Sequence, residues 1–140
     1  MGNLVAIDYG IKRTGLAHTD SGKIIASGLT SLTTDKVLGY LKAYCEMEDV
    51  DTFVIGQPRQ KDGNFAAVEE DILKFITDLK KIFPNIAVER YDERFTSKIA
   101  FQTMIDAGLK QKKRRDKGLV DQISATLILQ SYLDFKAHQL

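Results

Sequence analysis

The chain has 140 residues, enough for one compact domain with a sizeable core, and no second core is expected at this length. Apolar residues make up 44% and charged residues 28% of the chain, a balance that is ordinary for a globular protein and favours neither intrinsic disorder nor a fibrous protein. Because the formal net charge is only +1, affinity for a polyanion such as nucleic acid would have to come from locally clustered cations.

The first half of the chain predicts three strands in a meander, followed by a helix and a fourth strand. A polar turn at 20–22 joins the second strand to the third. Thr34 or Asp35 can cap a helix that runs through Cys45, because the apolar positions there recur at helical spacing. Residues 52–55 have the apolar character of a short buried strand. The first three strands are expected at 3–8, 13–19 and 23–32.

The second half of the chain predicts one more strand and three helices, each helix marked by an apolar stripe at helical spacing. Pro84 ends the first of these helices, Thr96 can cap the second, and Gly108 suits its C-terminal stop. In chain order, the segments are a loop at 56–63, a helix from Phe65 to Phe83, a strand at 86–91, a helix from Thr96 to Gly108, a basic loop at 110–117 and a helix from 118 to about 136.

This order of elements predicts an α/β fold, with a mixed five-stranded sheet and helices on both faces. Parallel strands need crossover connections, and the helices between the later strands supply them. The order resembles the ribonuclease H-like architecture, which is a three-layer fold. The sequence contains no internal repeat, low-complexity tract or linker, so residues 1–140 are expected to form a single domain.

Three acidic residues stand out by their positions in this pattern. Asp8 ends the apolar run at 4–7, Glu93 follows the strand at 86–91, and Asp121 opens the last helical segment. Carboxylates that meet at strand ends and a helix start suit Mg²⁺ or Mn²⁺, which bridge phosphate oxygens and activate water. The positions of these acids therefore suggest a nuclease.

Each of these acids also has an ordinary structural interpretation. Asp8 could be a turn residue that caps a hairpin. Glu93 could oppose a helix dipole, and the neighbouring Asp92 competes with it for any functional role. Asp121 would share an inward helix face with the small residues at 124–125, and a buried carboxylate is costly unless it is paired or metal-bound. Its position therefore favours a site over a simple dipole effect.

Basic residues near the acids could contact a phosphate backbone, although a basic loop is also an ordinary surface feature. In the segment from Asp8 to Gly15, glycines would allow close approach of an anion, but a hairpin turn would look similar. The loop at 57–64 could add a second contact or simply connect a strand to a helix. The cations expected to bind nucleic acid are Lys12, Arg13, Arg59, Lys61, Arg94, Lys112, Lys113, Arg114 and Arg115.

Other reactive residue types are sparse. The lone Cys45 cannot form an internal disulfide, and its place on an apolar stripe predicts a core position. His18 and His138 have no ligand partner at metal spacing, and no zinc, Ser-His-Asp or Walker motif is present. No charged start leads into a long apolar run, so we expect a cytoplasmic protein with no membrane association.

Taken together, four segments resemble the YqgF (RuvX) family of ribonuclease H-like nucleases, from end to end of the chain. The segments are VAIDYGIKRTGLA, VIGQP with a later DG, YDERFTS and KGLVDQISATLILQSYLD. The resemblance implies that Asp8, Glu93 and Asp121 form an acidic triad, in which Asp8 bridges two Mg²⁺ or Mn²⁺ ions and the other two acids each bind one. It also implies similarity to Holliday junction resolvases and a link to maturation of the 5′ end of 16S rRNA.

Two features depart from the family pattern, both at the end of the strand at 52–55. Ribonuclease H relatives commonly supply an acid where this chain has Gly56-Gln57-Pro58, so the second carboxylate must come from the next strand. Gln57 also stands where an apolar residue is more common, which could alter substrate contacts at this loop.

The preferred function is a metal-dependent endonuclease that hydrolyses phosphodiester bonds in structured nucleic acid. The family resemblance, and no spacing in this chain, implies that it processes the 5′ end of pre-16S rRNA. The alternatives are a Holliday junction resolvase, which would need a two-fold dimer, and a non-catalytic RNA- or ribosome-binding module. An actin- or hexokinase-like phosphotransferase is a further rival, but the chain is short for two such domains. Expected partners are structured RNA or a DNA junction and a ribosome or pre-ribosomal particle, with the chain a monomer or weak homodimer.

Overall fold

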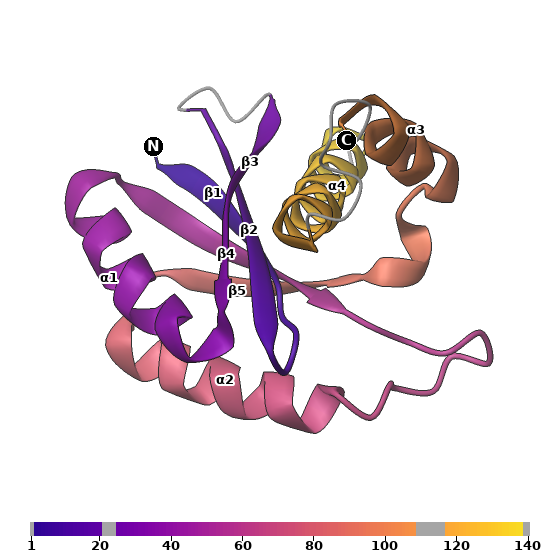
Figure 1. Ribbon diagram of the computed structural model, residues 1–140. Helices are drawn as coiled ribbons and strands as arrows, with labels where there is room; N and C mark the ends of the chain where they lie inside the picture. Colours follow the sequence, from indigo (N-terminus) through magenta and orange to yellow (C-terminus); the bar gives the residue numbers. More distant parts are fainter. Residues whose placement is uncertain (1, 21–24, 109–116, 139–140) are drawn as a thin grey trace.

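A five-stranded mixed sheet forms the middle layer of the protein (Figure 1). The computed structural model describes residues 2–20, 25–108 and 117–138. The strand order is β3-β2-β1-β4-β5; β1, β2 and β3 pair antiparallel, whereas β4 runs parallel to both β1 and β5. The strands are β1 (Asn3–Asp8), β2 (Arg13–Thr19), β3 (Ala26–Thr33), β4 (Val50–Gln57) and β5 (Ala87–Asp92).

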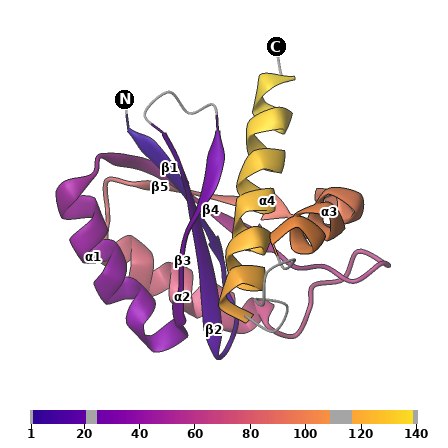
Figure 2. The same ribbon diagram turned by 45° about the horizontal axis from the view of Figure 1, so that its top comes forward.

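Helices cover both faces of this sheet, as the turned view makes clear (Figure 2). The first two lie on one face, the last lies on the other, and α3 packs beside α4. The α/β three-layer fold predicted from the order of elements is therefore confirmed. The helices described are α1 (Val37–Met47), α2 (Glu69–Ile82), α3 (Lys98–Gly108) and α4 (Lys117–Ala137), with 3-10 turns η1 (Thr34–Lys36) and η2 (Glu93–Phe95).

The central strand β1 contributes to two separate cores because successive side chains of a strand point to opposite faces. Val5 and Ile7 join the core beneath α1 and α2. The other face carries the small residues Ala6 and Ala17, against which α4 packs closely. Asp8 comes next, at the carboxyl end of β1 in the middle of the sheet.

The start of α1 differs from the prediction. Thr34 and Asp35 do not cap this helix; they belong to η1, and Lys36 occupies the cap position without a side-chain hydrogen bond. The Thr34 hydroxyl instead donates to the carbonyl of Gly10 at 2.5 Å. This contact ties the start of η1 to the β1–β2 turn, which explains why the hydroxyl is not available to α1.

Two further helices also begin later than predicted. The helix expected from Phe65 begins at Glu69, because Phe65 forms an isolated antiparallel bridge with Arg59 in the preceding loop. The helix expected to be capped by Thr96 is capped by Ser97, whose hydroxyl accepts from the backbone N–H of Ala100 at 3.0 Å.

The remaining boundaries agree closely with the prediction. α2 ends at Ile82, just before Pro84, and α3 ends at Gly108. β4 is longer than expected, and residues 21–24 of the predicted turn and third strand lie outside the described residues. Within the described ranges, no helix is long and apolar enough to cross a membrane.

Candidate active site

Asp8 lies at the centre of the candidate site, between strands β2 and β4. Burial raises the pKa of this carboxyl to about 7, and the negative charges of Glu93 and then Asp121 contribute to the rise. The fold therefore brings both Glu93 and Asp121 within electrostatic reach of Asp8, although the three acids are far apart in the sequence.

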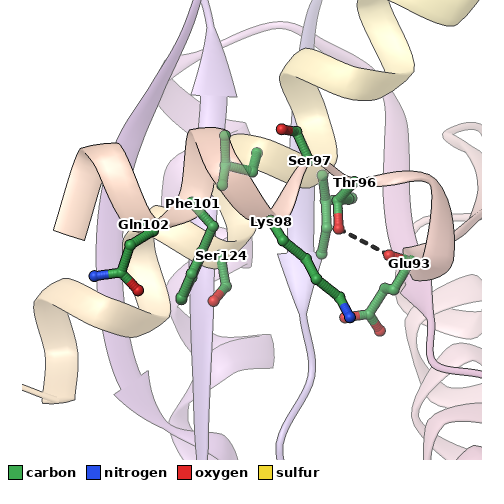
Figure 3. Close-up of a pocket in the computed structure, with 9 residues that line it drawn as sticks. Glu93, Thr96, Ser97, Lys98, Phe101, Gln102 and Ser124 are labelled. Atoms are coloured by element: carbon green, nitrogen blue, oxygen red, sulfur yellow. Dashed lines mark hydrogen bonds between the residues drawn. The ribbon is translucent and has the colours of Figure 1, made fainter.

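Glu93 approaches Asp8 from η2, directly after β5. A Cβ atom on Gly56 would lie 3.0 Å from the Oε2 atom of Glu93, so the missing side chain leaves room for this carboxylate at the end of β4. The Thr96 hydroxyl donates to the Glu93 carbonyl at 2.8 Å and closes the turn (Figure 3). Burial raises the pKa of Glu93, an effect that the nearby Arg90 opposes.

Asp121 projects from α4 toward the sheet, as its predicted inward face requires. Its Oδ2 atom accepts hydrogen bonds from Nε of Arg13 at 2.9 Å and from the Ser31 hydroxyl at 3.0 Å. Gly15, which pairs with Asp8 across β1 and β2, lies so close that a Cβ atom there would overlap the Asp121 carbonyl oxygen. The sequence suggested that this glycine admits an anion; in the fold it admits α4.

The carboxylates gather at one end of the sheet, but they do not converge on a single point. Among the residues described, no three acidic, histidine or cysteine side chains are close enough to hold one metal ion. Asp8 and Glu93 fit a divalent cation best: burial raises the pKa of both carboxyls, the charge of Glu93 adds to the rise at Asp8, and a bound cation would offset the cost of ionising them there. Asp121 would have to exchange Arg13 and Ser31 for such an ion.

Asp92, the neighbour of Glu93, is bound to arginines. It accepts from Nη2 of Arg94 at 2.8 Å and lies 3.6 Å from Nε of Arg59. The hydrogen bonds from Arg94 lower the pKa of Asp92 below its usual value. Since its carboxylate already has two cationic partners, the geometry favours Glu93 over Asp92 as the acid that acts with Asp8.

Cations line the outer side of Glu93. A hollow of about 500 Å³ is bounded by Pro58, Arg59, Lys61, Glu93, Arg94 and Lys98. Arg59, Lys61 and Arg94 were predicted from the sequence, but Lys98 was not, and its side chain extends toward the Glu93 carboxylate (Figure 3). The sequence did offer one indication that Lys98 lies at the site: it is in the first turn of α3, only five residues after Glu93.

A second hollow of about 390 Å³ adjoins Glu93 between α3 and α4 (Figure 3). Phe101 and Gln102 of α3 and Ser124 of α4 lie along it. Glu93 and Lys98 line both hollows and therefore stand between them. An extended substrate strand could follow this path across the site.

The other predicted phosphate contacts are more dispersed. Lys12 is exposed at the β1–β2 turn, and Arg13 next to it is paired with Asp121. The remaining predicted cations lie outside the described residues: Lys112, Lys113, Arg114 and Arg115.

A partly buried ion pair that was not predicted from the sequence supports the end of β4. Arg90 contacts both carboxylate oxygens of Glu69, at 2.7 and 2.8 Å. The same guanidinium donates to the carbonyls of Ile55 at 3.3 Å and Gly56 at 3.0 Å. It therefore links the first turn of α2 to the strand segment over which Glu93 lies. In the sequence, the one indication of this ion pair was the charged residue Arg90 within strand β5.

Two residues without an expected role in the site have structural partners. Cys45 was predicted in the core; it lies on α1 and is partly buried, packed against the edge of the core. The Nδ1 atom of His18 and the hydroxyl of Tyr44 are hydrogen-bonded at 2.8 Å.

Comparisons with known proteins agree with this picture. The family model described as "RuvX: Holliday junction resolvase" matches residues 2–135. A "Putative pre-16S rRNA nuclease" of Flavobacterium psychrophilum is 52% identical over 136 residues, covering 97% of this chain and 99% of that protein. A relative of the same name from Parabacteroides distasonis is 48% identical over 140 residues, with both chains covered completely.

Solved structures show the same fold at much lower sequence identity. T. thermophilus RuvC in complex with a Holliday junction substrate aligns with a TM-score of 0.57 and 15% identity, covering 96% of both chains. The fowlpox virus resolvase with Holliday junction DNA gives a TM-score of 0.51 and 15% identity, covering 96% of this chain and 98% of that one.

Proposed function

Since this chain belongs to the RuvX family, we propose that it is a divalent-metal-dependent endonuclease that processes the 5′ end of pre-16S rRNA. One observation carries the proposal: Asp8 and Glu93, from the ends of two strands, lie together beside a hollow lined by cations. Acids suited to a metal and cations suited to phosphate thus meet at one place on the domain formed by residues 1–140.

We assign Asp8 and Glu93 as the principal metal-holding residues, with Asp121 completing the set once it leaves Arg13. Two Mg²⁺ or Mn²⁺ ions are the expected complement. A divalent cation bound here would bridge phosphate oxygens and lower the pKa of water. Asp8 and Glu93 are carried by the ends of two strands, whereas Asp121 must first exchange Arg13 and Ser31 for the ion.

The cations around Glu93 are assigned to the substrate backbone. Arg59, Lys61 and Arg94 line the hollow on its outer side, and Lys98 joins them. Their charges offset the repulsion that a nucleic-acid strand would feel from the acids. Lys12 and Arg13, at the β1–β2 turn, and the basic segment at 112–115 are proposed to extend this contact.

RNA is the preferred substrate because the relatives with about 50% identity are named pre-16S rRNA nucleases. The family description names a Holliday junction resolvase, so DNA junctions form the second candidate. The solved resolvases share only 15% identity with this chain and support the fold, not the substrate. We also predict that the chain binds a ribosome or pre-ribosomal particle. Its expected state is a monomer or weak homodimer.

The test compares two labelled substrates under identical conditions with Mg²⁺ or Mn²⁺: a 16S rRNA precursor fragment and a four-way DNA junction. The proposal predicts cutting of the RNA at its 5′ extension and loss of that product in the Asp8→Asn variant. Paired symmetric nicks in the junction alone would assign a resolvase. Tight binding without cleavage of either substrate would assign a binding module. A separate assay with ATP and Mg²⁺ tests the phosphotransferase, which hydrolysis of the nucleotide would support.

A further inference from the structure

Two arginines at the candidate site each lie over the ring of an exposed phenylalanine. The Cζ atom of Arg59 is 4.5 Å from the ring centroid of Phe65, and that of Arg94 is 6.0 Å from the centroid of Phe95. Phe65 is 52% exposed and Phe95 is 68% exposed. These rings therefore contribute little to either core, and each keeps an open surface toward solvent.

Asp92 joins the two Arg–Phe pairs, although they come from different connections. Arg59 and Phe65 belong to the β4–α2 loop, where they also form a backbone bridge. Arg94 and Phe95 belong to η2, after β5. Because Asp92 contacts both guanidinium groups, it holds the two pairs side by side. We call these five residues the Arg–Phe surface.

Further hydrogen bonds fix the orientation of this surface. Arg59 donates from Nε to Oε1 of Gln57 at 3.1 Å and from Nη1 to the carbonyl of Gly63 at 3.3 Å. Gly63 has a φ of 89°, a conformation that favours glycine, and it allows the loop to turn beneath Arg94. The rings are thus held by the folded loop and are available without rearrangement.

The Arg–Phe surface adjoins the hollow that Glu93 shares with Arg59, Lys61, Arg94 and Lys98. Cations beside open aromatic faces are the combination that binds single-stranded nucleic acid, since cations follow the backbone and rings stack with bases. In a duplex, the bases are stacked on one another and cannot reach such rings. The surface therefore matches unpaired nucleotides better than duplex.

We propose that the Arg–Phe surface binds unpaired nucleotides next to the cleaved bond, with bases stacked on Phe65 and Phe95. The substrate strand is then single-stranded on one side of the cut, as in an RNA extension beyond a folded stem. This inference deepens the proposed function and rests on it for the position of the cut.

The experiment measures binding to an RNA hairpin with a single-stranded extension that carries the fluorescent base 2-aminopurine. The Asp8→Asn background keeps the RNA intact in Mg²⁺, and a complementary strand converts the extension to duplex for comparison. Phe65→Leu and Phe95→Leu keep the apolar bulk and remove the aromatic face. Phe135→Leu is the matched control, because this ring is 49% exposed on α4. Its ring packs against Tyr91, as the ring of Phe95 does, so this variant separates a change in packing around Tyr91 from loss of the aromatic face at the surface.

We expect each of the two Phe variants at the surface to weaken binding of the extension roughly five- to hundredfold. In these two variants, the quenching of 2-aminopurine fluorescence by stacking should also disappear. Their binding of the duplex form should not change, and the Phe135→Leu variant should bind the extension as the parent does. Equal affinity of the parent and the two variants for the extension would overturn the inference. The inference would also be overturned if the parent bound the duplex form as tightly as it binds the extension.

Failure of the proposed function has a different signature. If unsubstituted protein does not cut the RNA in Mg²⁺ but the Phe variants still lose binding, the surface is a binding site without the nuclease. If unsubstituted protein cuts the RNA and the Phe variants bind as the parent does, the nuclease stands and the Arg–Phe surface does not.

Discussion

Gly15 and Asp121 are in backbone contact, and no residue with a side chain could replace this glycine without moving α4. On the other side of Asp8, Gly56 makes room for the Glu93 carboxylate. Strands β2 and β4 flank the central strand that carries Asp8, so a glycine in each neighbour admits one acid from a distant part of the chain. This is how the fold gathers residues separated by long stretches of sequence.

Gly15→Ala should destabilise the protein by about 1–3 kcal/mol, since the new Cβ meets the backbone of α4, which cannot move independently. Urea unfolding of the variant would measure this change. Gly39→Ala is the control, because a Cβ atom at this position would have no atom within 4 Å and alanine favours a helix interior. A Gly15→Ala variant as stable as the unsubstituted protein would contradict the proposed packing.

Gly56→Ala should affect activity more than stability. Its Cβ would lie 2.9 Å from Cδ1 of Ile128 and 3.0 Å from Oε2 of Glu93, and both atoms are at the ends of side chains that can rotate away. We expect a loss of stability below about 1.5 kcal/mol and a decrease in cleavage rate of at least about tenfold. Cleavage at the unsubstituted rate would show that Glu93 need not occupy this position.

Much of the fold could be predicted because its signals are local. Apolar runs and helical stripes identified every strand and helix described, and the parallel strands followed from the intervening helices. The start of α2 could not be predicted from its stripe, because Phe65 has the spacing of a helical residue but pairs with Arg59. A tertiary contact decided that boundary.

The candidate acids could be found because they end or follow regular elements, whereas their surroundings depend on which elements meet. The contact of Gly15 with α4 and the reach of Lys98 toward Glu93 both require the packing of α3 and α4. The choice between Asp92 and Glu93 was open in the sequence, since both lie in one turn. In the fold, Arg94 of the same turn binds Asp92, and Arg59, from another loop, adds a second cation beside it.

Asp8→Asn should stabilise the protein at high pH when no divalent metal is present. The pKa of Asp8 is about 7 in the fold and 3.8 in its ordinary state, so between these values the folded protein binds more protons than the unfolded one. Its free energy of unfolding therefore falls as pH rises through this window. At pH 8 with EDTA, the variant should gain at most about 4 kcal/mol, and at pH 3 almost nothing.

Thermal unfolding at both pH values checks this expectation, with Asp78→Asn, an exposed acid on α2, as the control. Mg²⁺ should raise the melting temperature of the unsubstituted protein and leave Asp8→Asn unchanged. An Asp8→Asn variant no more stable than the parent at pH 8 would show that ionised Asp8 does not destabilise the fold.

Glu69→Gln should weaken the fold by about 1–3 kcal/mol, since it leaves the partly buried charge of Arg90 without its carboxylate partner. Glu70→Gln alters the exposed neighbour and should change stability little. The hydrogen bond from Arg90 lowers the pKa of Glu69, so this contribution is complete above its ordinary value of 4.5 and declines as the pH falls below it. Denaturant unfolding of both variants at pH 7 and pH 3.5 would reveal the difference, and equal stability of the two variants at pH 7 would exclude this role.

Glu93→Gln and Asp92→Asn should separate chemistry from substrate binding. Glu93→Gln removes an acid assigned to the metal and should lower kcat at least about a hundredfold. Asp92→Asn releases Arg59 and Arg94 from their shared partner, so KM should rise severalfold while the Mg²⁺ requirement stays the same. Steady-state kinetics over a range of Mg²⁺ concentrations distinguishes them, and the opposite pattern would make Asp92 the active acid.

Asp8 is the residue on which the proposed metal-dependent nuclease depends most. The most direct measurement is single-turnover cleavage of a labelled 16S rRNA precursor by the unsubstituted protein, Asp8→Asn and the control Asp78→Asn, with Mg²⁺ and with EDTA. We predict a defined product from the unsubstituted protein and Asp78→Asn in Mg²⁺, and none from Asp8→Asn or in EDTA. Cleavage by Asp8→Asn at the unsubstituted rate, or equal cleavage in EDTA, would contradict the assignment.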